Sequence, residues 1–180
     1  MKKSFVFFLL LLPVALYCQS LSVSNLPIIR INTKTRVIQD EPKIPVVMEV
    51  FDKGNGQLNQ LSASPTITTV AGIEFRGSTS QADFYFLPGF VKKPYGIELW
   101  TDSTGVTAKR MSLIQMPEES DWVLNASYND RSFMRDFMAH QIAGRLGLLH
   151  SETKFVELVI NNEYRGVYML MEKIKQGKNR

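Results

Sequence analysis

The residues of this 180-residue chain that could do chemistry are mainly basic, and they stand where predicted strands begin or end. Arg76 and Gly77 close one predicted strand, and Lys92 and Lys93 open the next. A guanidinium fork and an ammonium that converge beside a sheet are suited to holding a phosphate or a carboxylate. Gly77 has no Cβ and would allow a ligand to approach the backbone. The alternative is a surface ion pair for Arg76 and an ammonium that Lys93 extends past the strand end.

Lys93 is unusual because of the face that it occupies. Tyr95, Ile97 and Leu99 recur at the period of two that indicates a half-buried strand. Counting back by two places Lys93 on the same face. The pattern therefore predicts a lysine that points toward the apolar side of a sheet.

Two acidic residues are candidates for the same anion-binding site. Asp136 stands beside Phe137, at the border of the apolar stripe of a predicted helix, from which it could reach inward to a lysine. Glu172 ends an apolar strand and could line a cleft. The alternative for both carboxylates is solvation, on the outer face of the helix and at the strand end.

Composition excludes several classes of protein. The formal net charge is +4, and no run of Lys and Arg is longer than two, which argues against a nucleic-acid partner. Cys18 is the only cysteine, and His140 and His150 are the only histidines, so a Cys-based or His-rich metal centre is excluded. The signature motifs of P-loop, dinucleotide-binding, zinc-protease and serine-hydrolase sites do not occur in the sequence.

Residues 1–18 have the pattern of a secretory signal peptide: a basic start, an apolar stretch and a processing site. We therefore expect an exported protein, periplasmic or extracellular. The apolar stretch is short and contains a proline, so no stable membrane span is expected after cleavage. A lipoprotein anchor at Cys18 is the alternative, and Tyr17 disfavours it because small residues are usual before a lipidated cysteine.

Residues 19–180 are expected to form one α+β domain, a mostly antiparallel sheet with one main helix. Pro42 and Pro45 place the second strand at a sheet edge or delay its start. The apolar sequence VYMLM predicts that the last strand is central. The predicted strands occupy residues 26–33, 37–52, 68–77 and 93–100 and a hairpin of 154–160 with 165–173.

The predicted helix begins at Asp130, a good N-cap residue, and ends at Gly147, where a left-handed cap is expected. Its apolar residues recur at helical spacing and should face the core. They are Phe133, Met134, Phe137, Met138, Ile142 and Leu146.

Four stretches in this order resemble the spore coat protein H (CotH) kinase family: RGSTS, KKPYGIEL, DWVLNASYNDRSFMRDFMAHQIAGRLG and KFVELVINNEYRGVYMLMEKIKQGKNR. The resemblance runs from about Ile28 to Arg180. It implies an atypical protein kinase-like fold in which this chain resembles the N-lobe. It also implies transfer of the γ-phosphoryl group of ATP, with Mg²⁺, to Ser or Thr of a protein substrate.

The resemblance also implies roles for the candidate residues. A kinase N-lobe uses a strand lysine to hold nucleotide phosphates, and Lys93, Lys92 and Arg76 are the alternatives for this contact. Asp136 is the candidate to steady that lysine, and Glu172 to line the cleft between lobes.

The chain departs from the kinase pattern in two ways. It has no glycine-rich phosphate loop, so residues 78–89 would have to replace one, and the acidic residues that hold Mg²⁺ are expected outside this chain. The alternative function is a secreted, non-catalytic binding or structural module with the same fold.

Overall fold

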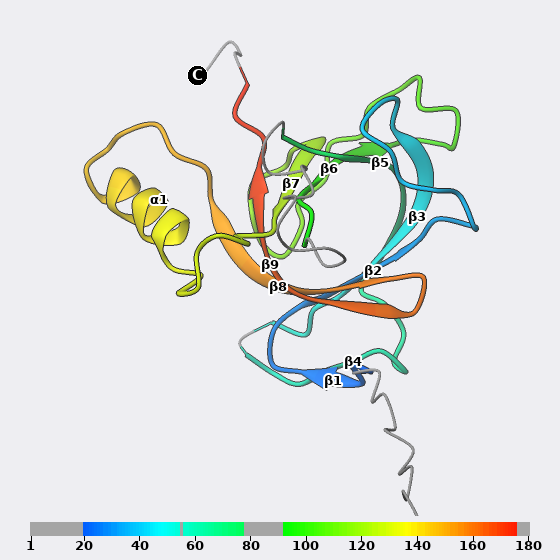
Figure 1. Ribbon diagram of the computed structural model, residues 1–180, viewed down its shortest axis with the longest axis horizontal. Helices are drawn as coiled ribbons and strands as arrows, with labels where there is room; N and C mark the ends of the chain where they lie inside the picture. Colours follow the sequence, from blue (N-terminus) through cyan, green and yellow to red (C-terminus); the bar gives the residue numbers. More distant parts are fainter. Residues whose placement is uncertain (1–19, 55, 78–91, 176–180) are drawn as a thin grey trace, which may run out of the picture.

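Seven strands close into a barrel in the computed structural model, which describes residues 20–54, 56–77 and 92–175 (Figure 1). Around the barrel the order is β2-β3-β5-β6-β7-β9-β8, and all neighbours are antiparallel except β2 and β8. The strands are β2 (Ile28–Asn32), β3 (Ile44–Phe51), β5 (Ile67–Phe75), β6 (Tyr95–Trp100), β7 (Asp121–Asn125), β8 (Thr153–Ile160) and β9 (Glu163–Glu172).

The predicted signal peptide at 1–18 and the segment 78–89 lie outside the described residues. Within the described ranges, no helix has the length and hydropathy of a membrane span.

The α+β prediction was wrong, because the protein is mostly β and its sheet closes on itself. Closure depends on the parallel pairing of β2 with β8, in which Ile28 lies beside Glu157. These residues are far apart in the sequence, and no local periodicity reports which distant strands pair. An open kinase N-lobe sheet that packs on a main helix is therefore not the fold of this chain.

α1 (Arg135–Arg145), the single α-helix among the described residues, lies outside the ring of strands (Figure 1). No residue of α1 is buried, contrary to the expected core-facing stripe. Phe137 is half-buried, with its ring centroid 5.1 Å from that of Phe155 on β8. Met138 and Ile142 are 46% and 50% exposed. The helical period was predicted correctly, but the barrel fills its own interior, and α1 places only Phe137 against a small outer cluster of Val123, Met169 and Met171.

The predicted ends of the helix were partly correct. The N-cap is Met134 rather than Asp130, but the Asp130 carboxylate still accepts a hydrogen bond from the backbone N–H of Arg135, at 2.8 Å. At the other end, Gly147 follows the C-cap residue with φ +71°, which confirms the left-handed cap.

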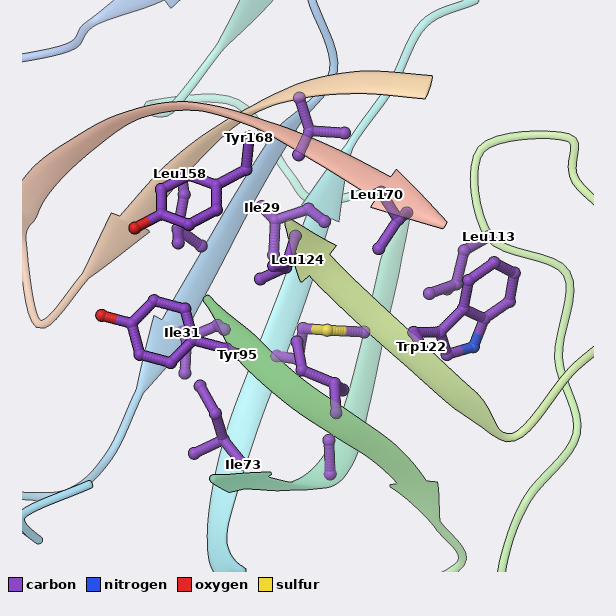
Figure 2. Close-up of a cluster of buried hydrophobic side chains, with 14 of the residues drawn as sticks. Ile29, Ile31, Ile73, Tyr95, Leu113, Trp122, Leu124, Leu158, Tyr168 and Leu170 are labelled. Carbon is purple, nitrogen blue, oxygen red and sulfur yellow. The ribbon is translucent and has the colours of Figure 1, made fainter. Parts of the chain in front are cut away.

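Alternating side chains fill the barrel, as Figure 2 shows for a part of this core. The inward-facing residues include Ile29, Ile31, Met48, Ala71, Ile73, Tyr95, Ile97, Leu99, Trp122, Leu124, Leu158, Tyr168 and Leu170. Most of them are aliphatic and completely buried, so the barrel is a packed core rather than a channel.

The strand predictions were more accurate than the fold class. The β8–β9 hairpin is confirmed, and Asn161 and Asn162 both adopt the positive φ of a tight hairpin turn. The central position of β9, between β7 and β8, is also confirmed. β3 starts late, at Ile44, but it lies between β2 and β5 and not at an edge. No pattern predicted β7 or the small separate sheet of β1 (Val23–Ser24) and β4 (Asn59–Gln60).

Candidate functional site

Two hollows lie at one end of the barrel, beside the adjacent residues Lys92 and Lys93. We call this end the mouth: β6 and β9 begin there, and β5 and β7 end there. Each hollow has a volume of about 320 Å³. The Lys92 hollow is lined by Lys92, Asn125, Asp130, Arg135, Asp136 and their neighbours. The mouth hollow is lined by Arg36, Phe75, Lys93, Tyr95, Asn161, Arg165 and their neighbours.

Lys92 completes the hydrogen bonding of β9 where β7 ends. β7 pairs with β9 as far as Asn125 and Met169, and the chain then turns away at Ser127, which has φ +45°. The register would next place Ser127 opposite Val167. Instead, the Lys92 ammonium donates a hydrogen bond to the carbonyl oxygen of Val167. A side-chain donor thus takes the place of a backbone N–H.

Two aromatic rings enclose the Lys92 ammonium. Its Nζ lies 4.5 Å from the ring centroid of Phe133 and 4.3 Å from that of Tyr168. Burial lowers the pKa of Lys92 from 10.5 to about 8, although the Glu157 carboxylate acts in the opposite direction. A strongly perturbed amine beside a hollow is a feature of functional sites, because function often requires a shifted pKa.

The α1 side of the Lys92 hollow contains an ordered carboxylate. Asn125 at the end of β7 donates a hydrogen bond to Asp136 Oδ2 at 2.8 Å. Lys92 and Asp136 thus line the same hollow, and the hydrogen-bond partner of Asp136 there is the Asn125 amide. The role predicted for Asp136, to steady a phosphate-binding lysine, stays a prediction.

Asp130 and Arg135 complete this side of the hollow. Hydrogen bonds from Ser132 and from the backbone N–H of Arg135 lower the pKa of Asp130. Arg135 Nε lies 3.8 Å from Asp130 Oδ1, and the Arg135 side chain is 81% exposed. The guanidinium therefore lies at the solvent side of the hollow.

Lys93 faces the other way, into the mouth hollow. Its Nζ lies 4.9 Å from the ring centroid of Phe75, and it lines the hollow together with Tyr95. The predicted sharing of one face by Lys93 and Tyr95 is confirmed, and the apolar side in question is the barrel interior. The backbone of Lys93 is held by Tyr168, whose hydroxyl donates to the Lys93 carbonyl oxygen at 3.0 Å.

The other two basic residues of the mouth hollow, Arg36 and Arg165, were missed by the sequence analysis. Arg36 follows β2, and Arg165 lies near the start of β9. Arg36 could have been singled out as a candidate anion ligand because it follows the end of a predicted strand, which was the reason for choosing Arg76. Nothing in the local sequence indicated that these two arginines lie near Lys93.

Arg76 and Glu172 do not join either hollow. Arg76 is exposed after β5, and its backbone N–H donates to Pro94 at 3.1 Å. Glu172 lies at the opposite end of the barrel, about 17 Å along β9 from Val167 at ~3.3 Å per residue. It pairs in register with Trp122 and is only 2% exposed, so solvation of this strand end was a wrong alternative.

A metal site does not form among the residues that the structure describes: no three His, Cys, Asp or Glu side chains gather there in a way that could hold an ion. The Asp130 and Asp136 carboxylates are occupied by hydrogen bonds from Ser132, Arg135 and Asn125. The lysine and arginine donors of the Lys92 hollow suit phosphate oxygens, whereas its acidic groups do not form a cage for Mg²⁺.

The fold and the hollows define a β-barrel protein with a candidate anion site beside an outer helix. The family profile described as CotH kinase protein matches residues 73–180, well over half of the chain. This chain therefore belongs to the CotH kinase family. The matched region contains both lysines, α1 and the β8–β9 hairpin, whereas β2 and β3 precede it. A search of curated proteins found no match.

Proposed function

We propose that this chain is part of an exported protein kinase that transfers the γ-phosphoryl group of ATP to Ser or Thr of a protein substrate. We further propose that the Lys92 hollow holds the phosphates of the nucleotide. Membership of the CotH kinase family and the signal-peptide pattern of residues 1–18 support the activity and the export. The observation that carries the site is the half-buried Lys92 ammonium, which stands at one hollow with Arg135 and Asp136.

Lys92 is suited to phosphate because it is held in place before a ligand arrives. An ammonium has three donors, and the hydrogen bond to Val167 uses one of them. The rings of Phe133 and Tyr168 fix its position. A preorganised cation needs no reorganisation when negative charge develops during transfer. ATP, when bound, supplies the phosphoryl group.

Arg135 and Asp136 would act from the α1 side. The exposed Arg135 guanidinium can form paired hydrogen bonds to phosphate oxygens. Asp136, held by Asn125, keeps the carboxylate side of the hollow in a fixed position. Among the residues that the structure describes, no cluster of acidic side chains fits Mg²⁺.

Nucleotide binding to the full-length protein tests this proposal. We expect Lys92→Ala to weaken binding of a fluorescent ATP analogue by about tenfold or more, the effect of losing a hydrogen bond to a charged group. Lys53→Ala is the matched control, because Lys53 is exposed and follows β3 at the opposite end of the barrel. Unchanged affinity in Lys92→Ala would mean that the phosphates bind elsewhere.

The second candidate function is non-catalytic binding, and the charge of the Lys92 hollow favours it. The two basic groups, Lys92 and Arg135, are balanced by Asp130 and Asp136, whereas a triphosphate would be attracted more strongly by a net positive site. Incubation of the full-length protein with γ-labelled ATP, Mg²⁺ and a generic Ser/Thr-rich protein separates the candidates. Label on the protein acceptor supports the kinase, and nucleotide binding without transfer supports the module.

A further inference from the structure

We infer that the mouth hollow is a second ligand site, which binds a small soluble phosphate monoester carrying an apolar or aromatic group. This site is separate from the Lys92 hollow. Lys92 and Lys93 are neighbours in the chain, but they precede β6, and their side chains line two hollows that have no lining residue in common. The inference does not depend on kinase activity.

The charge of the mouth hollow indicates an anion. Arg36, Lys93 and Arg165 line it and come from three separate segments, so only the fold brings them together. Glu163 forms an ion pair with Arg165, with an Nη2–Oε2 distance of 2.6 Å. The described lining thus contains three basic groups, of which Arg165 is paired with Glu163. A phosphate monoester carries about −1.5 to −2 charges near pH 7, opposite in sign to these groups.

The donors are of the kinds that bind phosphate. Arg36 Nη1 donates to the carbonyl oxygen of Pro45 at 3.1 Å, which holds the guanidinium at the rim while its other N–H groups extend away from this contact. A guanidinium fork fits two phosphate oxygens, and an ammonium such as that of Lys93 adds a point charge.

The rim that carries these groups is fixed by a reciprocal pair of hydrogen bonds. The backbone N–H of Thr33 donates to Asn161 Oδ1 at 2.9 Å, and Asn161 Nδ2 donates to Thr33 Oγ1 at 2.9 Å. This pair ties the end of β2 to the β8–β9 turn. Arg36 follows Thr33 after β2, and Arg165 follows Asn161 in β9. The two hydrogen bonds therefore hold together the two segments that carry the arginines of the hollow.

The wall of the mouth hollow is apolar, which adds a carbon group to the expected ligand. Phe75 and Tyr95 lie with ring centroids 5.7 Å apart, and Ile38 and Val37 line the same hollow. Val37 is 81% exposed, beside the basic groups. In Figure 2, the hydroxyl groups of Tyr95 and Tyr168 point to the same side of the core. Inorganic phosphate could use only the cations, whereas an aryl or alkyl phosphate would also cover this wall.

Calorimetric titration of the full-length protein with phenyl phosphate, inorganic phosphate, benzoate and phenol tests the inference. We expect phenyl phosphate to bind most tightly of the four. Arg36→Ala, Lys93→Ala and Arg165→Ala should each weaken its binding by about tenfold, because each removes a charge-assisted contact. Lys93→Arg should retain most of the affinity. Lys53→Ala is the control, and thermal melting confirms that each variant is folded.

Three outcomes would overturn the inference. Equal affinity for phenyl phosphate and inorganic phosphate would remove the role of the apolar wall. Equal affinity for benzoate would remove the specificity for phosphate. Loss of phenyl phosphate binding in Lys92→Ala but not in Lys93→Ala would place the ligand in the other hollow. Failure of ATP transfer would leave this inference unaffected, because its readout is the binding of a ligand that is not a nucleotide.

Discussion

The two hollows at the mouth have similar volumes, but they differ in how their lysines are held and in their charge. Lys92 is enclosed by two rings and a backbone carbonyl, and its hollow has balanced charges. Lys93 faces the barrel interior beside Phe75, and two arginines join it from distant segments. Two adjacent basic residues therefore do not define one site. Each of the two lysines lines a hollow with its own set of neighbours.

Tyr168 is the group that the two lysines share, so its removal should have the largest effect. Its ring lies under the Lys92 ammonium, its hydroxyl holds the backbone of Lys93, and it is 1% exposed. Tyr168→Ala should lower the free energy of unfolding by about 3–5 kcal/mol, the cost of a large core cavity. Tyr168→Phe should lose only about 1 kcal/mol, for one hydrogen bond. Urea unfolding measures both, and equal losses would show that packing of the ring is not what supports the mouth.

Reciprocal substitutions of the two lysines should separate the two ligands. Lys92→Ala should weaken ATP-analogue binding by about tenfold and leave phenyl phosphate binding within about twofold, since only one charged hydrogen bond is lost. Lys93→Ala should do the reverse. Parallel titrations of both variants with both ligands provide the measurement. A variant that loses both ligands while remaining folded would show that the hollows act as one site.

The pH dependence should report the burial of Lys92. The ¹³C shift of its ε-carbon should titrate with a pKa of about 8, well below the ordinary 10.5. Phe133→Ala should raise this pKa, because removal of the ring lets water reach the ammonium. ATP-analogue binding should fall as the pH rises through 8, since the ammonium loses its charge. A Lys92 pKa that stays unchanged in Phe133→Ala would argue against enclosure by that ring.

The same pKa shift has a consequence for stability. Because the pKa of Lys92 is lower in the folded state, the unfolded chain binds more protons between pH 8 and 10.5. The contribution of Lys92 to stability should therefore increase as the pH rises through this window. Comparison with Lys92→Met, which cannot titrate, isolates the contribution, and parallel pH profiles of the two proteins would contradict it.

Asn125 should give the smallest effect, confined to the Lys92 hollow. Asn125→Ala removes the hydrogen bond to Asp136, which is exposed and therefore weak, so a change of about two- to threefold in ATP-analogue affinity is expected. Phenyl phosphate binding should not change. Fluorescence titration can resolve this difference, and a larger effect on phenyl phosphate than on the nucleotide would be inconsistent with two separate sites.

Local patterns in the sequence predicted the local structure well. The alternation of Tyr95, Ile97 and Leu99 correctly placed Lys93 on the inward face. The paired asparagines and flanking apolar runs identified the β8–β9 hairpin. The motifs also indicated the family, because they preserve residue order over much of the chain. Each of these signals depends on residues that are close in the sequence.

Long-range structure could not be predicted in the same way. Nothing local indicates that β2 pairs in parallel with β8, so the closed barrel was missed. The missed closure also explains why α1 was wrongly predicted to bury its apolar residues in the main core. The closed barrel fills that core with its own side chains, and no residue of α1 is buried. The same reason applies to Arg36 and Arg165, which the fold brings to Lys93 from the two sides of the rim. Glu172 was placed correctly at a strand end, but that end is buried and distant from both hollows.

The most direct test of the account is a ¹³C-lysine spectrum of the full-length protein, recorded at pH 8 with and without a non-hydrolysable ATP analogue. Assignment by Lys92→Arg and Lys93→Arg identifies the two ε-carbon signals. We predict that the Lys92 signal moves toward its protonated position, since a nearby phosphate favours the charged ammonium, and that the Lys93 signal stays in place. Movement of the Lys93 signal alone would contradict the account, because it would place the nucleotide at the mouth hollow.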